Sequence, residues 1–154
     1  MLSSLTRQVA ALGAAVLFST LVLFAASPAQ AGAGSYAETA ERATNAVRVQ
    51  HGVRRAKGSD CLRRYAVRQA AKMAARRTIY HQDLGAVLRG CDLSYAGENV
   101  AVGFGTGRSV VRQGWMRSAG HRRNILDPRF RKVEVAARKG SDGQWYVAQV
   151  FGRR

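Results

Sequence analysis

An apolar segment near the amino terminus sets how much of this 154-residue chain is left to fold into a domain. Residues 1–7 carry one cation and no acid, and residues 9–26 are apolar apart from a serine and a threonine. An Ala-Gln-Ala tripeptide that ends at Ala31 then supplies small residues of the kind a signal peptidase reads. The sequence therefore predicts a secretory signal peptide over residues 1–31 and one folded domain over residues 32–154.

An uncleaved membrane anchor is the alternative, because the apolar run is just long enough to span a bilayer. Pro28 breaks an apolar helix just before the small-residue tripeptide, which favours cleavage after Ala31. We therefore expect a protein that is secreted, either outside the cell or in the cell envelope, with no transmembrane span after cleavage.

The chain is strongly basic, with 25 lysines and arginines against 9 aspartates and glutamates and a formal net charge of +16. Of these cations only Arg7 lies in the predicted signal peptide, so the basicity belongs to the exported domain. A charge of this size predicts polyanionic neighbours. Export excludes intracellular nucleic acid and favours lipid headgroups and anionic envelope polymers, although an arginine-rich composition also follows from a GC-rich genome. The sequence shows no oligomer interface.

Two cysteines, Cys61 and Cys91, remain in the predicted mature chain. An even pair in an oxidising compartment usually forms a disulfide. A bridge between them would close a loop of about 31 residues, which stabilises a fold by roughly 3–4 kcal/mol in the chain-entropy treatment.

Apolar residues in the first part of the domain recur at helical spacing. A first helix should end near Gly52, and its buried positions are Tyr36, Ala40, Ala43 and Val47. A second helix should begin at Ser59 or Asp60, and its buried stripe is Leu62, Ala66, Ala70 and Met73. Its opposite face is a basic ridge made of Arg64, Arg68, Lys72 and Arg76. Like charges at this spacing repel each other, which destabilises the helix slightly. The ridge is interpreted either as a solvated face or as a contact for a polyanion.

The second part of the domain mixes short helices with strands. In chain order, the predicted elements are a short helix over 84–88, a strand or tight loop over 97–103, a helix capped by Ser109, a turn over 124–128, and strands over 133–137 and 145–151. The last two alternate around a turn signal at Ser141-Asp142-Gly143, which predicts an antiparallel hairpin. Helices first and a hairpin last favour an α+β domain. The glycine-rich run over 103–107 lacks phosphate-loop spacing and is interpreted as a flexible loop.

Few side chains of the predicted domain can carry chemistry. His51 stands at a polar helix end and is expected on the surface, which leaves His81 and His121 as the remaining imidazoles. Ser118, His121 and Glu98 could act as nucleophile, base and orienting acid. Against this hypothesis, no G-x-S-x-G elbow is present, and Ser118 would cap the following helical turn equally well.

Three short motifs surround these residues. They are Gly97-Glu98-Asn99-Val100-Ala101, residues 115–126 with the sequence WMRSAGHRRNIL, and residues 145–152 with the sequence WYVAQVFG. By their order and spacing, the chain resembles the bacterial secreted members of the CAP superfamily, which carry the SCP-like extracellular domain. The resemblance covers about residues 36–152 and includes an upstream histidine, His81, after the second predicted helix.

The resemblance implies a three-layer α-β-α sandwich of the CAP/SCP type, which is an α+β fold with a cleft. It implies that His81, Glu98 and His121 meet in the cleft, with Ser118 and Asn99 as further cleft residues. Asn99 alternatively satisfies buried backbone groups. Some family members bind a divalent cation through the two histidines, so His81 and His121 are candidate zinc ligands, although no cofactor is required.

The chain departs from the family pattern at three places, the mildest of which is Ala119 where the family more usually has proline. Residues 112–120 contain no acid, so the second cleft glutamate of many eukaryotic members is missing. Glu134 stands where bacterial relatives often have glycine, and the sequence does not tell whether it reaches the cleft.

Three classes of function remain open at this point. The favoured hypothesis is a non-enzymatic binding module of the cell envelope that holds a lipid, a sterol or an anionic polymer. The alternative is a metal-dependent hydrolase of an envelope polymer or peptide, with a cation on His81 and His121 and with Glu98 as general base. The third is a secreted polyanion-binding or toxic protein that acts through its charge alone.

Overall fold

The computed structural model describes residues 28–154, with side chains from residue 32 onward. The apolar segment over residues 9–26, predicted as a signal peptide or an anchor, therefore lies outside the described residues. Among residues 28–154, no helix combines the length and the hydropathy that a membrane span needs.

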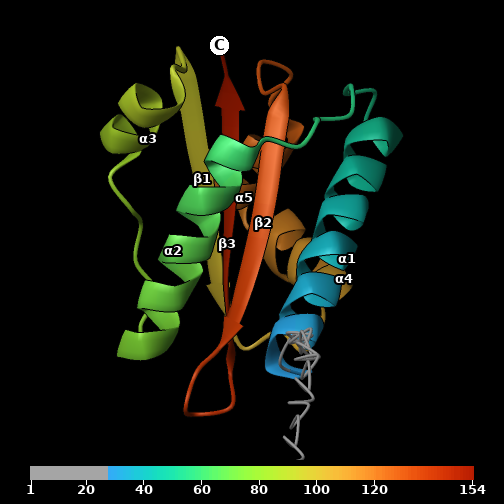
Figure 1. Ribbon diagram of the computed structural model, residues 1–154. Coiled ribbons are helices and arrows are strands. Elements are labelled where there is room, and N and C mark those ends of the chain that lie inside the picture. Colours follow the sequence, from blue (N-terminus) through green and yellow to red (C-terminus); the bar gives the residue numbers. More distant parts are fainter. Residues whose placement is uncertain (1–27) are drawn as a thin grey trace, which may run out of the picture.

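Three helices come first, one strand and a second group of helices follow, and two strands end the chain. The helices are α1 (Pro28–Gln50), α2 (Asp60–Arg76), α3 (Leu84–Cys91), α4 (Gly107–Ser109) and α5 (Ala119–Leu126), with a π-helical turn η1 (Val110–Gly114) and a 3-10 turn η2 (Trp115–Arg117) before α5. The strands are β1 (Tyr95–Val102), β2 (Lys132–Lys139) and β3 (Trp145–Arg153). They form one antiparallel sheet in the order β1-β3-β2, so β1 and β2 are its two edges (Figure 1).

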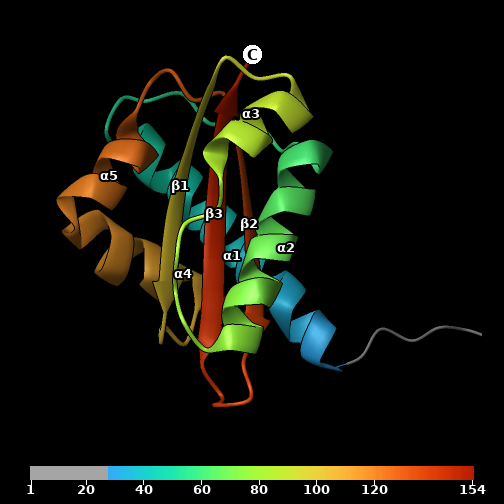
Figure 2. The ribbon, with the colours of Figure 1, turned by 90° about the vertical axis from the view of Figure 1, so that its left-hand side faces the viewer.

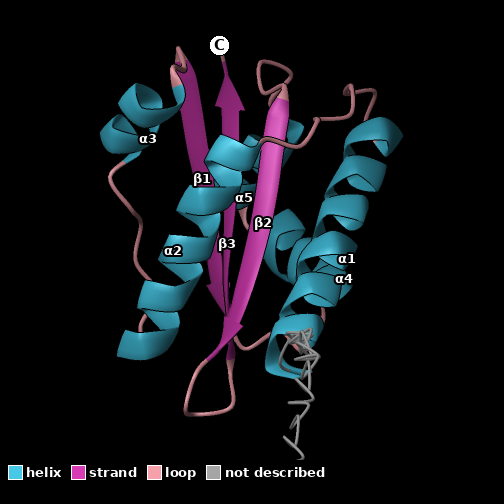
Figure 3. Ribbon diagram, viewed as in Figure 1, coloured by secondary structure: helices cyan, strands magenta, loops and turns pink. Residues whose placement is uncertain are grey.

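The sheet is the middle of three layers, with helices on both of its faces (Figure 3). Turned by 90°, the molecule shows α2 and α3 on one side of the sheet and α4 and α5 on the other (Figure 2). Each face has its own core. Residues from α1, η1, η2 and α5 pack on one face with Val133, Val135 and Phe151, while residues from α2 and α3 pack on the other with Ala136 and Val150. The predicted α-β-α sandwich is confirmed.

The two long helices follow the predicted stripes. The four apolar residues predicted for the first helix are at most 8% exposed, and the chain leaves the helix near Gly52, where φ is +71°. The four predicted for α2 are at most 1% exposed, and the basic ridge on the opposite face is exposed. Ser59 stands at the amino-terminal cap position of α2, but its side chain makes no capping hydrogen bond. The predicted disulfide joins Cys61 on α2 to Cys91 at the end of α3.

The helix predicted to be capped by Ser109 begins earlier than expected. Thr106 is the capping residue, because its hydroxyl accepts a hydrogen bond from the Ser109 backbone N–H, while the Ser109 side chain bonds back to Thr106. Gly107 lies so close to α1 that a Cβ atom there would stand 2.2 Å from the Tyr36 carbonyl oxygen. Gly107 is therefore a close-packing point against α1, whereas residues 103–106 form a loop, as predicted, whose flexibility stays a prediction.

The strands match their predictions, whereas the turn predicted over residues 124–128 is helical up to Leu126, where α5 ends. Residues 97–103, which fitted a strand or a tight loop, fall within strand β1 except for Gly103. The hairpin predicted around Gly143 is formed by β2 and β3, and Gly143 adopts a φ of +75°, which glycine reaches without strain.

Candidate functional site

The candidate site lies at the β1 edge of the sheet, where the segment between α2 and α3 runs beside the strand (Figure 2). Glu98 comes from β1, His81 from the segment, and His121 from the first turn of α5. Successive side chains of a strand point to opposite faces. Glu98 therefore points to the face of α2 and α3, whereas Asn99 points to the face of α5.

Glu98 is a buried carboxylate whose two oxygens are both engaged. Its side chain is 1% exposed, and its Oε2 atom lies 2.8 Å from His81 Nδ1. Gln82 donates twice, from its backbone N–H to Oε2 at 3.1 Å and from its side-chain Nε2 to Oε1 at 2.6 Å. The pairing fixes the His81 ring with Nδ1 toward Glu98 and leaves Nε2 for a ligand, since the His81 side chain is 59% exposed.

His121 faces the same site from α5. Burial lowers the pKa of His121 below its ordinary value of 6.5, and the nearby His81 lowers the pKa further. At neutral pH the His121 ring is therefore uncharged and keeps one nitrogen as a hydrogen-bond acceptor.

A chain of buried amides positions α5 against β1. Asn99 is fully buried, and its Nδ2 donates to the His121 carbonyl at 3.2 Å and to Gln149 Oε1 at 2.9 Å. Asn124 donates to Asn99 Oδ1 at 2.9 Å and to the Glu98 carbonyl at 3.0 Å. Gln149 continues the chain to the Thr44 hydroxyl at 2.8 Å. Asn99 and Asn124 therefore connect the backbones of His121 and Glu98, with Asn99 holding the His121 carbonyl and Asn124 the Glu98 carbonyl.

Ser118, the remaining predicted cleft residue, stands at the start of α5. It occupies the amino-terminal cap position, yet its hydroxyl makes no capping hydrogen bond. Its backbone carbonyl accepts from the Arg122 N–H at 2.8 Å. Within residues 28–154, no hydrogen bond joins the Ser118 hydroxyl to His121, so nothing in this geometry activates it as a nucleophile.

The donor set does not fit a zinc site with three protein ligands. Zinc in proteins is held by three or four side chains, whereas His81 and His121 supply two, and hydrogen bonds from Gln82 and His81 engage Glu98. In the part of the chain that the structure describes, no three His, Cys, Asp or Glu residues are grouped so that they could hold a metal ion.

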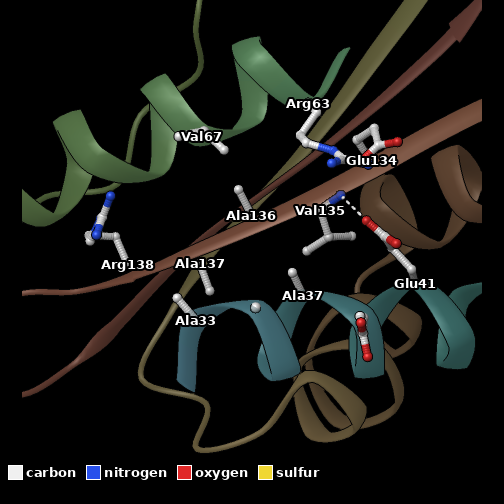
Figure 4. Close-up of a pocket in the computed structure, with 12 residues that line it drawn as sticks. Ala33, Ala37, Glu41, Arg63, Val67, Glu134, Val135, Ala136, Ala137 and Arg138 are labelled. Atoms are coloured by element: carbon white, nitrogen blue, oxygen red, sulfur yellow. Dashed lines mark hydrogen bonds and ion pairs between the residues drawn. The ribbon is translucent and has the colours of Figure 1, made fainter. Parts of the chain in front are cut away.

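Glu134 lies at the opposite edge of the sheet, on β2, and lines a different groove (Figure 4). Its Oε1 accepts from the Ser59 N–H at 2.6 Å, and its Oε2 lies 3.4 Å from Arg63 Nε. Glu41 caps the exposed edge of β2 by accepting from the Val135 N–H at 2.9 Å. The pKa of Glu41 is raised above its ordinary value; burial is the main cause, and the charge of the nearby Glu134 raises the pKa further. The groove has a volume of about 380 Å³ and is bounded by α1, α2 and β2.

Sequence reasoning missed two residues of the candidate site. Gln82 carries no motif signal, because its role depends on the turn that brings it over Glu98. Asn124 belongs to the WMRSAGHRRNIL motif, but its partners on β1 are 25 and 26 residues away in sequence. A capping or periodicity argument cannot find such contacts.

The fold and the site define an α-β-α sandwich with two histidines and a glutamate at one edge of its sheet. The family model described as CAP, the cysteine-rich secretory protein family, matches residues 41–151. The chain belongs to this family.

Individual relatives agree with this assignment. The chain is 32% identical over 108 residues to the uncharacterized protein YkwD of Bacillus subtilis; the match covers 66% of this chain and 42% of YkwD. The structure is similar to that of an extracellular protein containing a SCP domain from Bacillus anthracis, with a TM-score of 0.71 and 25% identity, over 84% of this chain and 45% of the other. It shares its fold with an outer surface protein of Borrelia burgdorferi, with a TM-score of 0.66 and 21% identity, over 76% of this chain and 91% of the other.

Proposed function

We propose that this protein is a secreted, non-enzymatic binding module of the cell envelope that holds an amphipathic lipid at His81 and His121, in the cleft that the family resemblance implies there. The proposed location rests on the signal-peptide pattern of residues 1–31 and on the extracellular and outer-surface relatives. Protein sequencing of the secreted form tests it. We expect a mature chain that begins at Gly32, and a secreted chain that begins at Met1 would contradict cleavage.

The hydrogen bonds made by Glu98 are the reason that we favour a binding function over hydrolysis. A general base must reach the proton that it removes, whereas the buried Glu98 carboxylate accepts from Gln82 on both oxygens and pairs with His81. Its role in this geometry is to orient His81. The cleft then offers the outward Nε2 of His81 and the uncharged ring of His121, which together can hydrogen-bond the hydroxyl or phosphate of a lipid headgroup.

Vesicle binding at two salt concentrations separates cleft binding from simple charge attraction. Vesicles of phosphatidylcholine and phosphatidylglycerol are titrated with the wild-type protein and with His81→Ala/His121→Ala, at about 0.05 M and about 0.5 M NaCl. We expect the wild type to keep most of its binding at high salt, and the double variant to lose about tenfold in affinity, or about 1.4 kcal/mol.

His51→Ala is the matched control, because His51 is exposed and lies outside the cleft. It should bind as the wild type does. Loss of binding at high salt in all three proteins would show that the net charge alone attracts the vesicles, and the cleft proposal would be wrong.

A further inference from the structure

A pocket lined by cations lies at the β2 edge of the sheet, at the end where the loop between α1 and α2 passes the start of β2 (Figure 1). Its volume is about 350 Å³. We name it the basic pocket, and its lining residues are Arg54, Arg55, Lys57, Gly58, Arg131 and Lys132. It contains five cationic side chains and no acid.

Backbone pairing forces the cations of two distant segments together. Lys57 and Lys132 form a parallel β-bridge. The Lys57 N–H donates to the Arg131 carbonyl at 2.9 Å, and the Val133 N–H donates to the Lys57 carbonyl at 3.0 Å. The cations of the α1–α2 loop therefore stand beside those of β2 as a consequence of the fold.

Two side chains of α1 hold this loop rigidly. The Asn45 side chain makes two hydrogen bonds to the backbone of Ala56: its Nδ2 donates to the Ala56 carbonyl at 3.1 Å, and its Oδ1 accepts from the Ala56 N–H at 2.8 Å. Arg48 donates to the Arg54 carbonyl and to the Phe130 carbonyl, each at 2.9 Å. The loop cannot move apart to relieve the repulsion between its cations without breaking these bonds.

Arg48 also adds a positive charge behind the pocket. It is fully buried, and its pKa is lowered first by burial and then by the charge of Arg131. The Arg48 guanidinium is joined to the pocket by its bond to the carbonyl of Arg54, one of the lining residues.

The five cations of the basic pocket have no carboxylate partners. Within residues 28–154, no acidic group lies within 4.0 Å of any of them, although Arg42, Arg63 and Arg129 elsewhere do have such partners. Like charges that are held together without counter-charges raise the free energy of the folded state, and a bound anion would offset that cost.

We propose that the basic pocket binds a phosphate polymer, with two or more successive phosphate groups against its arginines and lysines. Guanidinium groups match the planar geometry of phosphate oxygens by paired hydrogen bonds, and lysines add compact charges. A single phosphate carries at most about two negative charges at neutral pH, so one group cannot neutralise five cations. The site is independent of the His81 cleft, which lies at the other edge of the sheet.

Two matched charge-removing variants test the proposal. Arg55→Gln/Lys57→Gln changes the basic pocket, and Arg64→Gln/Lys72→Gln removes the same charges from the basic ridge of α2. All four side chains are solvent-accessible. Binding of inorganic polyphosphate is measured by calorimetry at about 0.15 M salt. We expect the pocket variant to bind at least about tenfold more weakly and the ridge variant to lose less than about threefold.

Three further measurements complete the test. Polyphosphate should raise the unfolding temperature of the wild type and of the ridge variant more than that of the pocket variant. His81→Ala should bind polyphosphate as the wild type does, which separates this proposal from the cleft. Poly-glutamate of equal charge should bind more weakly than polyphosphate. Equal losses in the two double variants, or equal binding of poly-glutamate, would overturn the proposal.

Discussion

Replacing Arg48 by methionine should destabilise the fold strongly, because Arg48 is a buried tie between three segments. Its guanidinium donates to four carbonyl oxygens, those of Arg54 at 2.9 Å, Ile125 at 2.7 Å, Asp127 at 3.1 Å and Phe130 at 2.9 Å. No water can reach the guanidinium, since the residue is 0% exposed.

The magnitude follows from the carbonyls that the substitution leaves behind. Two of the four bonds are buried, and an unsatisfied buried carbonyl costs about 1–3 kcal/mol. The other two carbonyls are partly buried and can bind water. The methionine side chain fills space that the buried arginine stem already fills, so it adds little burial, and release of the cation from desolvation offsets only part of the cost of about 2–6 kcal/mol for the two carbonyls. We expect a net loss of about 2–4 kcal/mol.

Urea unfolding followed by tryptophan fluorescence measures the loss. With an m-value of about 2 kcal/mol/M, the urea midpoint should fall by about 1–2 M. The urea midpoint of Arg48→Lys should lie between those of the wild type and Arg48→Met, because lysine keeps the charge but not the planar fork of donors. Arg112→Met is the control, since Arg112 is exposed, and it should change stability by no more than about 0.5 kcal/mol. An Arg48→Met midpoint within about 0.5 M of the wild type would refute the reasoning.

For two other perturbations, the structure predicts the direction in which the free energy of unfolding changes. The pKa of His121 is lowered in the folded state, so the unfolded state binds the proton more tightly; the contribution of His121 to stability is present above about pH 6.5 and is lost as the pH falls through the folded pKa. Urea unfolding from about pH 7 to about pH 5 should therefore show a steeper decline for the wild type than for His121→Gln, and parallel declines would contradict this. Cys61→Ser/Cys91→Ser removes a bridge that spans 30 residues and should lower the unfolding free energy by about 3–4 kcal/mol, as read from the same urea curves. A loss below about 1 kcal/mol would show that the loop is already restricted without the bridge.

The stripes of the long helices were readable from the sequence because burial of one helix face repeats at a fixed period. The start of α4 was not read correctly, because the segment offers two hydroxyls three residues apart. Thr106 is the cap and Ser109 is its reciprocal partner. The tight contact of Gly107 with α1 joins residues 71 positions apart and leaves no local signal.

The candidate site, too, was only partly predictable from the sequence. The resemblance named His81, Glu98 and His121; the structure brings the first two into contact and joins the His121 carbonyl to Asn99, the neighbour of Glu98. Whether they bind a ligand stays a prediction. The engagement of Glu98 by Gln82 depends on a turn, and it could not be derived from residue types.

The cations showed the same limit of sequence reasoning. The basic ridge of α2 was visible as an i, i+4 repeat. The basic pocket was not, because the bridge between Lys57 and Lys132 joins segments 75 positions apart. Its two halves read as ordinary basic loops until the sheet is formed.

The disulfide also affects what a protease can do to the folded protein. It closes residues 61–91 into a covalent ring, and that ring includes the exposed stretch Arg76-Arg77-Thr78-Ile79 just before His81. A trypsin-like enzyme that cuts after Arg76 or Arg77 opens the ring at one point only. The two pieces stay joined through sulfur, so His81 is not released from the rest of the protein. A molecule that is nicked at this one place therefore stays a single covalent unit until the disulfide is reduced.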